Sequence, residues 1–163
     1  MWNELFLIPC LTGLVLAIVL PLLGAYLRLR DEWLAALAYA HVSAAGALLA
    51  LVSGLPPAGG GVGLALAAGA GKRVFAARLS GGASYALLLL ASWSVAILLA
   101  ANHPLAERLG HALFDGQLYF ADAATLGMVA AGGAISLLAL RYLSRNLLLA
   151  HLYPDFFRIR GLR

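Results

Sequence analysis

The stretch LFLIPCLTGLVLAIVLPLLGAYL, residues Leu5–Leu27, decides the structural class of this protein. It contains no charged residue over 23 positions, and a helix needs about 20 apolar residues to cross the hydrocarbon core of a bilayer. Glu4 precedes it where a cleaved signal peptide would have positive charge, and the run is longer than the apolar core of such a peptide. We therefore expect a retained transmembrane helix here.

The composition of the whole chain indicates the same class. Hydrophobic residues make up 63% and charged residues 11% of the 163 positions, whereas soluble domains average about 45–50% and 25%. These values exclude a disordered chain and argue against a soluble globular one. The net charge of +4 does not by itself indicate a nucleic-acid partner, and we expect none. The single cysteine, Cys10, can form no internal disulfide.

Four further apolar runs follow along the chain. They are Trp33–Ser53, Leu55–Gly71, Ala83–Ala101 and Ala123–Leu140. Leu55–Gly71 is the shortest, has Pro56 and Pro57 near its start and is rich in glycine. From its length alone, this run is either a short membrane span or a re-entrant segment.

The positions of the basic residues decide between these two alternatives. If all five runs cross and the N-terminus is outside, 10 of the 11 Lys and Arg residues lie in the cytoplasm and only Arg108 lies outside. A re-entrant Leu55–Gly71 would move Lys72, Arg73 and Arg78 outside, against the positive-inside rule. The sequence therefore predicts an all-α, polytopic transmembrane helix bundle of about five spans over residues 1–145, with the C-terminus cytoplasmic. Residues 146–163 are predicted to form a cytoplasmic tail helix.

Small residues recur four positions apart within the predicted spans. They are Ala36, Ala40 and Ala44 in the second span, Gly59 and Gly63 in the third, and Gly127 and Ala131 in the fifth. Such spacing lets helix backbones approach closely in lipid. It indicates helix packing within one bundle, with a dimer face as the alternative.

The segment Asn102–Asp122 is the only sizeable outer loop in this topology. Leu105, Leu109 and Leu113 lie on one side of a helix over Pro104–Leu113, which predicts a short amphipathic helix at the membrane surface. His103 and His111 are in the same loop and could bind metal. Their separation of eight residues is not a recognised ligand spacing, so a solvated interfacial loop is the alternative.

His41 lies within the second predicted span. It is eight residues after Trp33, about 12 Å along a helix, and therefore near the middle of the membrane. Ionisable residues at that depth are costly and usually face a bundle interior or a cavity. His41 is therefore either a residue of a transit path or a neutral histidine that is hydrogen-bonded to Ser43 or to a neighbouring helix.

The tail after Arg145 has the features of a short basic helix. Pro154 suits the first turn of a helix and Asp155 complements the helix dipole, while Gly161 can end the helix. Arg158 lies towards its other end, where Arg160 adds a second positive charge. Such a helix can rest on anionic lipid or dock on a cytoplasmic partner.

No motif indicates an enzyme. Gly69–Lys72 is followed by Arg73 and lacks the spacing of a phosphate-binding loop. An intramembrane serine nucleophile at Ser84 is a weak alternative, because no histidine is placed to act as its base. We therefore predict a protein that is not an enzyme and binds no cofactor tightly.

The order of these features resembles the membrane permeases of bacterial ATP-driven zinc, manganese and iron importers. Leu23–Arg30 resembles the end of the family's first span, and Ala36–His41, followed by Gly46, is similar to its Gly-Asp-Ala-Leu-Ser-His motif. Leu113–Leu118, followed by Asp122, resembles its Leu-Phe-Gly-Asp segment. Pro154–Arg158, followed by Gly161, is similar to its cytoplasmic Asp-Pro-Glu-Phe-Ala-Arg run.

The chain also departs from the family pattern. Leu37 stands where the family has an intramembrane Asp, whereas the His is retained as His41, and Asp115-Gly116 inverts the family's Gly-Asp pair. Family members continue through several more spans beyond the position of Arg163. The resemblance therefore indicates either the N-terminal part of a permease or a shortened member. The alternative function is a truncated or non-transporting membrane scaffold that associates with other membrane subunits.

The resemblance implies a multi-pass permease subunit of a divalent metal importer in the bacterial cytoplasmic membrane. His41 would lie on the path of the transported metal, whose identity the sequence does not specify because no carboxylate accompanies this imidazole. An extracytoplasmic metal-binding protein would deliver the ion, and a second permease copy or another membrane subunit would complete the complex within the lipid. A cytoplasmic ATPase subunit would hydrolyse the ATP and contact Pro154, Asp155, Phe156, Arg158 and Gly161.

Overall fold

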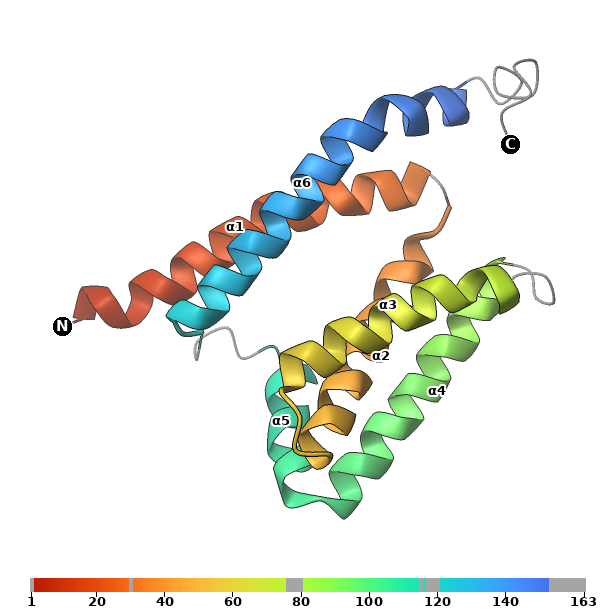
Figure 1. Ribbon diagram of the computed structural model, residues 1–163. Helices are drawn as coiled ribbons and strands as arrows, with labels where there is room; N and C mark the ends of the chain where they lie inside the picture. Colours follow the sequence, from red (N-terminus) through yellow and green to blue (C-terminus); the bar gives the residue numbers. More distant parts are fainter. Residues whose placement is uncertain (1, 30, 76–80, 115, 117–120, 153–163) are drawn as a thin grey trace. The chain divides into compact units, whose positions relative to one another are not determined.

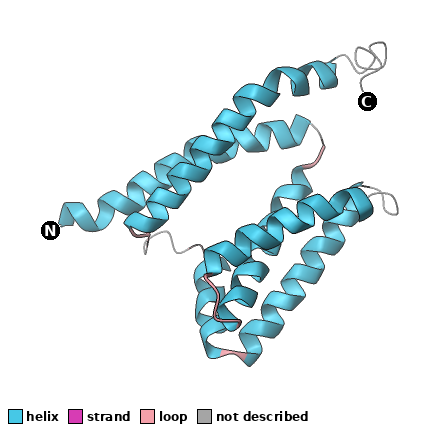
Figure 2. Ribbon diagram, in the orientation of Figure 1, coloured by secondary structure: helices cyan, strands magenta, loops and turns pink. Residues whose placement is uncertain are grey.

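The computed structural model describes residues 2–29, 31–75, 81–114, 116 and 121–152, and describes side chains for 6–29, 31–71, 82–114, 116 and 121–144. These residues form helices and no strand (Figures 1 and 2). The helices are α1 (Trp2–Leu29), α2 (Trp33–Val52), α3 (Pro57–Phe75), α4 (Gly81–Asn102), α5 (Pro104–Phe114) and α6 (Ala123–Leu152). The predicted all-α class is confirmed for the described part of the chain.

Four of the described helices are long and apolar enough to cross a membrane. The candidate spans are Phe6–Leu29, Trp33–Val52, Gly82–Asn102 and Ala123–Ser144. Helix α3, which contains most of the predicted run Leu55–Gly71, is not among the four. Its many glycines and the pair Lys72-Arg73 make it less apolar than the others. A polytopic helical membrane protein is therefore established, whereas the fifth crossing and the orientation stay predictions.

Helices α1 and α6 form one compact unit and lie side by side (Figure 1). Thr12 and Val19 on α1 are buried. Gly133 on α6 lies so close that a Cβ built on it would be 3.1 Å from Cγ2 of Val19. The Thr12 hydroxyl donates a hydrogen bond of 2.8 Å to the carbonyl of Ile8, so this buried polar group is satisfied within its own helix. The seam between the two helices is therefore narrow and closely packed.

Most of the remaining surface of α1 and α6 is apolar and exposed. Leu14 and Ile18 on α1 are 58% and 53% exposed, and Ile135 on α6 is 67% exposed. An extensive exposed apolar surface is typical of proteins in contact with lipid. The surface of this unit thus agrees with its assignment to the membrane.

Helix α6 begins with a side-chain cap. The hydroxyl and the backbone N–H of Thr125 both donate to Oδ1 of Asp122, at 2.6 and 2.8 Å. These bonds, first that from the hydroxyl, hold the pKa of the exposed Asp122 carboxyl below its ordinary value, because they favour the ionised form. Asp122 therefore satisfies a backbone N–H at the start of α6 that has no partner within the helix.

Helices α2, α3, α4 and α5 form the second compact unit, in which α2 contacts each of the other three. The buried side of α2 is built from small side chains, and only Leu48 among its fully buried residues is large. Ala35, Ala38, Val42 and Ala45 follow one another at spacings of three and four residues, as expected for one helix face. The small side chains on this face allow three helices to approach α2 closely.

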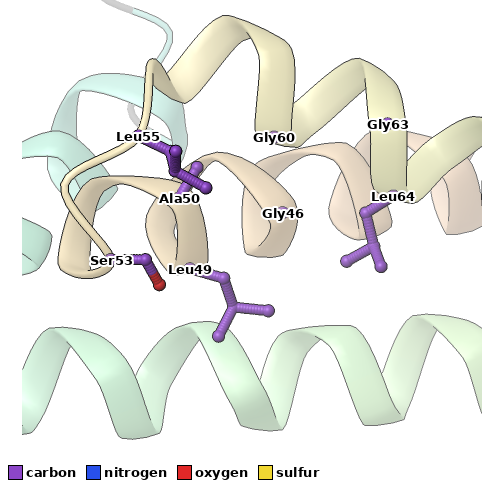
Figure 3. A pocket seen from close by; sticks show the side chains of 8 residues that line it. All are labelled: Gly46, Leu49, Ala50, Ser53, Leu55, Gly60, Gly63 and Leu64. Carbon is purple, nitrogen blue, oxygen red and sulfur yellow. The ribbon is translucent and has the colours of Figure 1, made fainter.

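The closest approach in this unit joins α2 and α3. A Cβ built on Gly46 would lie 2.5 Å from the carbonyl oxygen of Gly60, and one built on Gly61 would lie 2.9 Å from that of Ser43. Only glycine fits at these positions without moving a backbone. An apolar groove of about 320 Å³ lies beside this contact and is lined by Gly46, Leu49, Ala50, Ser53, Leu55, Gly60, Gly63 and Leu64 (Figure 3).

The residues that make this contact are not those predicted from the four-residue spacing. A Cβ on Gly59, Gly63 or Gly127 would meet nothing within 4 Å. Ala36 and Ala40 are on the exposed side of α2. The prediction of close packing within the bundle is therefore wrong for these positions, because spacing alone does not say which side of a helix meets its neighbour. The dimer-face alternative stays a prediction.

The short helix predicted between residues 104 and 113 is present as α5. Its packed side contains Ala106 and Gly110, which are buried, whereas Leu105 and Leu113 are 54% and 44% exposed. Leu109 is partly buried and packs on the core of this unit. Helix α5 packs against α4 and α2, and its C-terminal end turns back along α4 (Figure 1). Its place at the membrane surface stays a prediction.

Candidate functional site

His41 is held by a hydrogen bond within its own helix. Its Nδ1 lies 2.8 Å from the carbonyl oxygen of Leu37, one turn earlier on α2. A carbonyl oxygen can only accept, so Nδ1 is the donor, and in the neutral imidazole Nε2 retains its lone pair. The predicted hydrogen bond to Ser43 or to a neighbouring helix is therefore corrected: the partner is the backbone of α2 itself. Leu37 contributes this carbonyl at the position where the family pattern has Asp.

Two aromatic rings cover the half-buried imidazole. The ring centroid of Trp93 on α4 is 4.9 Å from that of His41, with an angle of 36° between the planes. Phe114, at the end of α5, is 5.7 Å from His41 and 5.3 Å from Trp93. Three helices thus place one ring each in a single cluster of His41, Trp93 and Phe114, which we call the aromatic cluster.

The aromatic cluster shows how far α5 returns along α4. Trp93 precedes the end of α4 at Asn102 by nine residues, about 14 Å along the helix. Phe114 contacts Trp93 at this level. If α4 spans the membrane, the end of α5 lies well inside the apolar layer. The end of α5 therefore contributes a side chain to the surroundings of His41.

A groove of about 290 Å³ runs between α4 and α5 and ends at the aromatic cluster. Its walls are two stripes of residues at i, i+3, i+4 and i+7 on facing helices. The stripe on α4 is Trp93, Ala96, Ile97 and Ala100, and the stripe on α5 is Glu107, Gly110, His111 and Phe114. Most of the lining is apolar, and among the described residues of the lining only Glu107 and His111 are ionisable. We call this space the α4–α5 groove.

His103 stands just before α5. Its backbone carbonyl accepts a hydrogen bond of 3.0 Å from the N–H of Glu107, and its own N–H donates to Leu99. Its Nδ1 is buried and has no hydrogen-bond partner. Glu107 is therefore midway between two histidines, His103 and His111, at four residues from each. The two histidines were predicted as possible metal ligands, whereas the carboxylate between them was not.

Among the described residues, no group of three or more His, Cys, Asp or Glu side chains is close enough to hold a metal ion together. Cys10 is exposed on α1 and belongs to the other unit.

Several residues singled out in the sequence lie outside the described part. These are Asp115 and the predicted ATPase contacts Pro154, Asp155, Phe156, Arg158 and Gly161. Helix α6 continues to Leu152, beyond the predicted start of the tail at residue 146. The tail helix and its contacts stay predictions.

Comparisons with known proteins give one result for nearly the whole chain. The model of the ABC 3 transport family matches residues 3–163. No curated protein and no solved structure matches the chain. Because the match covers almost every residue, including all four candidate spans, the chain belongs to the ABC 3 transport family and is a permease component of an ABC transporter.

Proposed function

We propose that this chain is the membrane-spanning permease subunit of an ATP-driven divalent metal importer of the zinc, manganese and iron class, located in the bacterial cytoplasmic membrane. A cytoplasmic ATPase subunit supplies the energy, so the permease itself hydrolyses no nucleotide. An extracytoplasmic metal-binding protein delivers the ion, which is cargo and not a bound cofactor. A second permease copy or another membrane subunit completes the path.

The observation that supports this proposal is the geometry of His41. The bond from Nδ1 to the Leu37 carbonyl fixes the ring and leaves the lone pair of Nε2 for a ligand. Imidazole nitrogen is a common ligand of zinc and of several first-row metals. His41 is about 12 Å along α2 from Trp33, a depth at which an ionisable side chain is costly and usually functional.

The aromatic cluster indicates which state of the transport cycle this arrangement represents. Trp93 and Phe114 lie over the imidazole, with ring centroids at 4.9 and 5.7 Å. Trp93 and Phe114 line the α4–α5 groove and His41 does not, so we infer that an ion in this groove reaches His41 past these two rings. We therefore assign the arrangement to a state in which His41 is closed to the groove.

The transport role is tested by metal uptake in cells that express the chain with its ATPase and its extracytoplasmic binding protein. His41→Ala removes the ligand and is expected to reduce zinc or manganese uptake to the level of cells without the chain. Leu37→Ala is the matched control, because its side chain is exposed and its backbone carbonyl still accepts the bond. Uptake that is unchanged in His41→Ala contradicts a role of His41 in transport.

The ATPase contact is tested separately. Phe156→Ala combined with Arg158→Glu is expected to abolish co-purification with a co-expressed ATPase subunit, because it removes an aromatic anchor and reverses a charge. The chain must still reach the membrane in normal amount. Unchanged co-purification contradicts the assignment of residues 154–161 as the coupling segment.

A non-transporting membrane scaffold is the second candidate function. The replacement of the family's intramembrane Asp by Leu37 favours it, because His41 then has no carboxylate one turn away. Cells with and without the gene distinguish the two: equal metal uptake supports the scaffold, and a difference that depends on His41 supports the importer.

A further inference from the structure

We propose that Glu107 and His111 on α5 form a capture site for a divalent transition-metal ion in the α4–α5 groove. This inference depends on the proposed function for the role of the ion as cargo. The binding site itself is a separate claim about two side chains that lie on a different helix from His41.

The spacing of the two residues suits a shared ligand. Side chains four residues apart on a helix are neighbours, with Cβ atoms about 5–6 Å apart. Glu107 and His111 both line the α4–α5 groove. One supplies a carboxylate oxygen and the other an imidazole nitrogen, a combination that zinc and other first-row divalent metals accept.

The surroundings of the pair favour a cation. The other residues of the groove are Gly, Ala, Ile, Trp and Phe, and none of them is ionised. Glu107 and His111 are themselves exposed, so a cation can reach them from water, and the apolar walls strengthen its attraction to the carboxylate only in part. Arg108 follows Glu107 in the sequence but does not line the groove. Among the described lining residues, no Lys or Arg competes for Glu107.

His103 marks the outer approach to this pair. It precedes Glu107 by four residues, and its buried Nδ1 has no hydrogen-bond partner. His103 and His111 are about 12 Å apart along the helix direction, too far to ligate the same ion. Glu107 is four residues from each histidine and could bind a metal ion together with either one. Of the two histidines, His111 lines the groove, so the pair of Glu107 and His111 is the one that lies on the way to the aromatic cluster.

The inner end of the groove joins this pair to His41. His111 is three residues, just under one turn, before Phe114, and Phe114 contacts both Trp93 and His41. An ion bound by Glu107 and His111 would thus lie about one helical turn from the two rings beside the imidazole. The site holds the ion in the outer loop until the aromatic cluster opens.

The test uses zinc and the purified full chain in detergent, with binding measured by isothermal titration calorimetry. Glu107→Gln and His111→Ala are each expected to weaken zinc binding about tenfold or more, because each removes one of two ligands. Arg108→Gln is the matched control on the same helix and is expected to bind zinc as the unchanged chain does. The helical content of each variant is compared by circular dichroism.

A ligand exchange tests the pairing independently of the loss of binding. Glu107→Cys with His111→Cys, in a Cys10→Ser background, is expected to bind cadmium with a thiolate-to-metal charge-transfer absorption. Glu107→Cys with Ala112→Cys is the control, because residue 112 is five positions away and does not line the groove. Equal absorption from both pairs overturns the proposed geometry.

The outcomes separate this inference from the proposed function. Zinc binding that is unchanged in Glu107→Gln and His111→Ala overturns the capture site, while His41-dependent uptake would still support transport. Zinc binding that is lost in His103→Ala but not in His111→Ala also overturns it, because the ion would then lie at the outer pair. Loss of zinc binding in both groove variants, together with equal metal uptake by cells with and without the chain, supports the site and contradicts the importer.

Discussion

The carbonyl oxygen of Gly46 on α2 lies 2.5 Å from the point that a Cβ of Gly60 on α3 would occupy. The oxygen is a backbone atom and the Cβ would be bonded directly to the backbone of Gly60, so neither could move aside as the end of a flexible side chain would. The two helices are therefore at a distance that only glycine permits at this crossing.

Substitution of Gly60 by Ala is expected to push α2 and α3 apart and to lower the free energy of unfolding by about 1–3 kcal/mol, the usual cost of overpacking. Unfolding by a denaturing detergent, followed by circular dichroism, measures the change. Gly59→Ala is the control, since a Cβ there meets nothing within 4 Å, and its higher helix propensity adds about 0.5–1 kcal/mol. Equal destabilisation in both variants would contradict the close crossing.

Substitution of Phe114 by Ala is expected to expose His41, because Phe114 is one of two rings that cover the imidazole. Chemical modification of His41 by diethyl pyrocarbonate, followed by mass spectrometry, should become several times faster. Leu113→Ala is the control, because this neighbour is 44% exposed and is not part of the aromatic cluster. A modification rate that stays constant even in the Trp93→Ala, Phe114→Ala double variant would show that the rings do not shield His41.

Substitution of Leu37 by Asp is expected to raise metal uptake if the chain is an importer. The new carboxylate would be one helical turn before His41, within reach of an ion held by the imidazole. The charge costs about 2.5–3.5 kcal/mol at the centre of a span, so the amount of protein in the membrane must be measured in parallel. Ala36→Asp, one position around α2, is the control and should not raise uptake. A gain that persists after His41→Ala would rule out cooperation between the two side chains.

The cap of α6 is expected to weaken at low pH. Bonds from Thr125 lower the pKa of the Asp122 carboxyl in the folded protein. Their stabilising contribution is therefore fully present above the unfolded pKa of about 3.9 and is lost as the pH falls through the lower folded value. Hydrogen exchange at the amides of Thr125 and Leu126, relative to the intrinsic rate at each pH, measures the fraying of this turn.

Two variants separate the charge of Asp122 from its geometry. Asp122→Asn keeps an oxygen acceptor for the cap but cannot titrate, so its exchange protection should not change over the same pH range. Asp122→Ala should lose protection at every pH. The same acid-induced loss in the Asn variant as in the unchanged protein would show that another group is responsible.

Composition and apolar run length were sufficient to predict the membrane-spanning helices. The run Leu5–Leu27 is contained in α1, Trp2–Leu29, and Ala83–Ala101 is contained in α4. In a bilayer, the backbone of such a run has no hydrogen-bond partner other than itself, so a helix follows directly from its composition. Helix existence therefore needed no knowledge of tertiary contacts.

The contacts between helices were not predictable in the same way. Gly59 and Gly63 have the four-residue spacing expected of a helix contact, but the close contact joins Gly46 on α2 to Gly60 on α3. The point where two helices cross depends on both of them, so the spacing within one helix does not predict it. For α5, the leucine spacing did not indicate that Ala106 and Gly110 pack against protein, since apolar residues face either lipid or protein in a membrane. In that environment hydrophobicity does not distinguish the interior from the exterior.

The candidate site shows the same limit. His41 was identifiable because an ionisable residue in an apolar run is rare. Trp93 and Phe114 gave no such signal, because aromatic residues are ordinary in spans and these two are 21 positions apart on different helices. Glu107 lies four residues from each of the two histidines that were predicted as possible metal ligands, so the sequence already contained the spacing on which its proposed role rests.

The pairing of α1 with α6 has a consequence for biosynthesis. Val19 and Gly133 meet although they are 114 positions apart in the sequence. A ribosome that adds about 5–20 residues per second leaves α1 in the bilayer for roughly 6–23 s before its partner emerges. During that interval the Thr12 hydroxyl, already bonded to Ile8, offers no unsatisfied group to the lipid. Because of this internal hydrogen bond, α1 can stay in the bilayer without a partner helix. Early insertion of α1 is therefore compatible with the later packing of α6 against it.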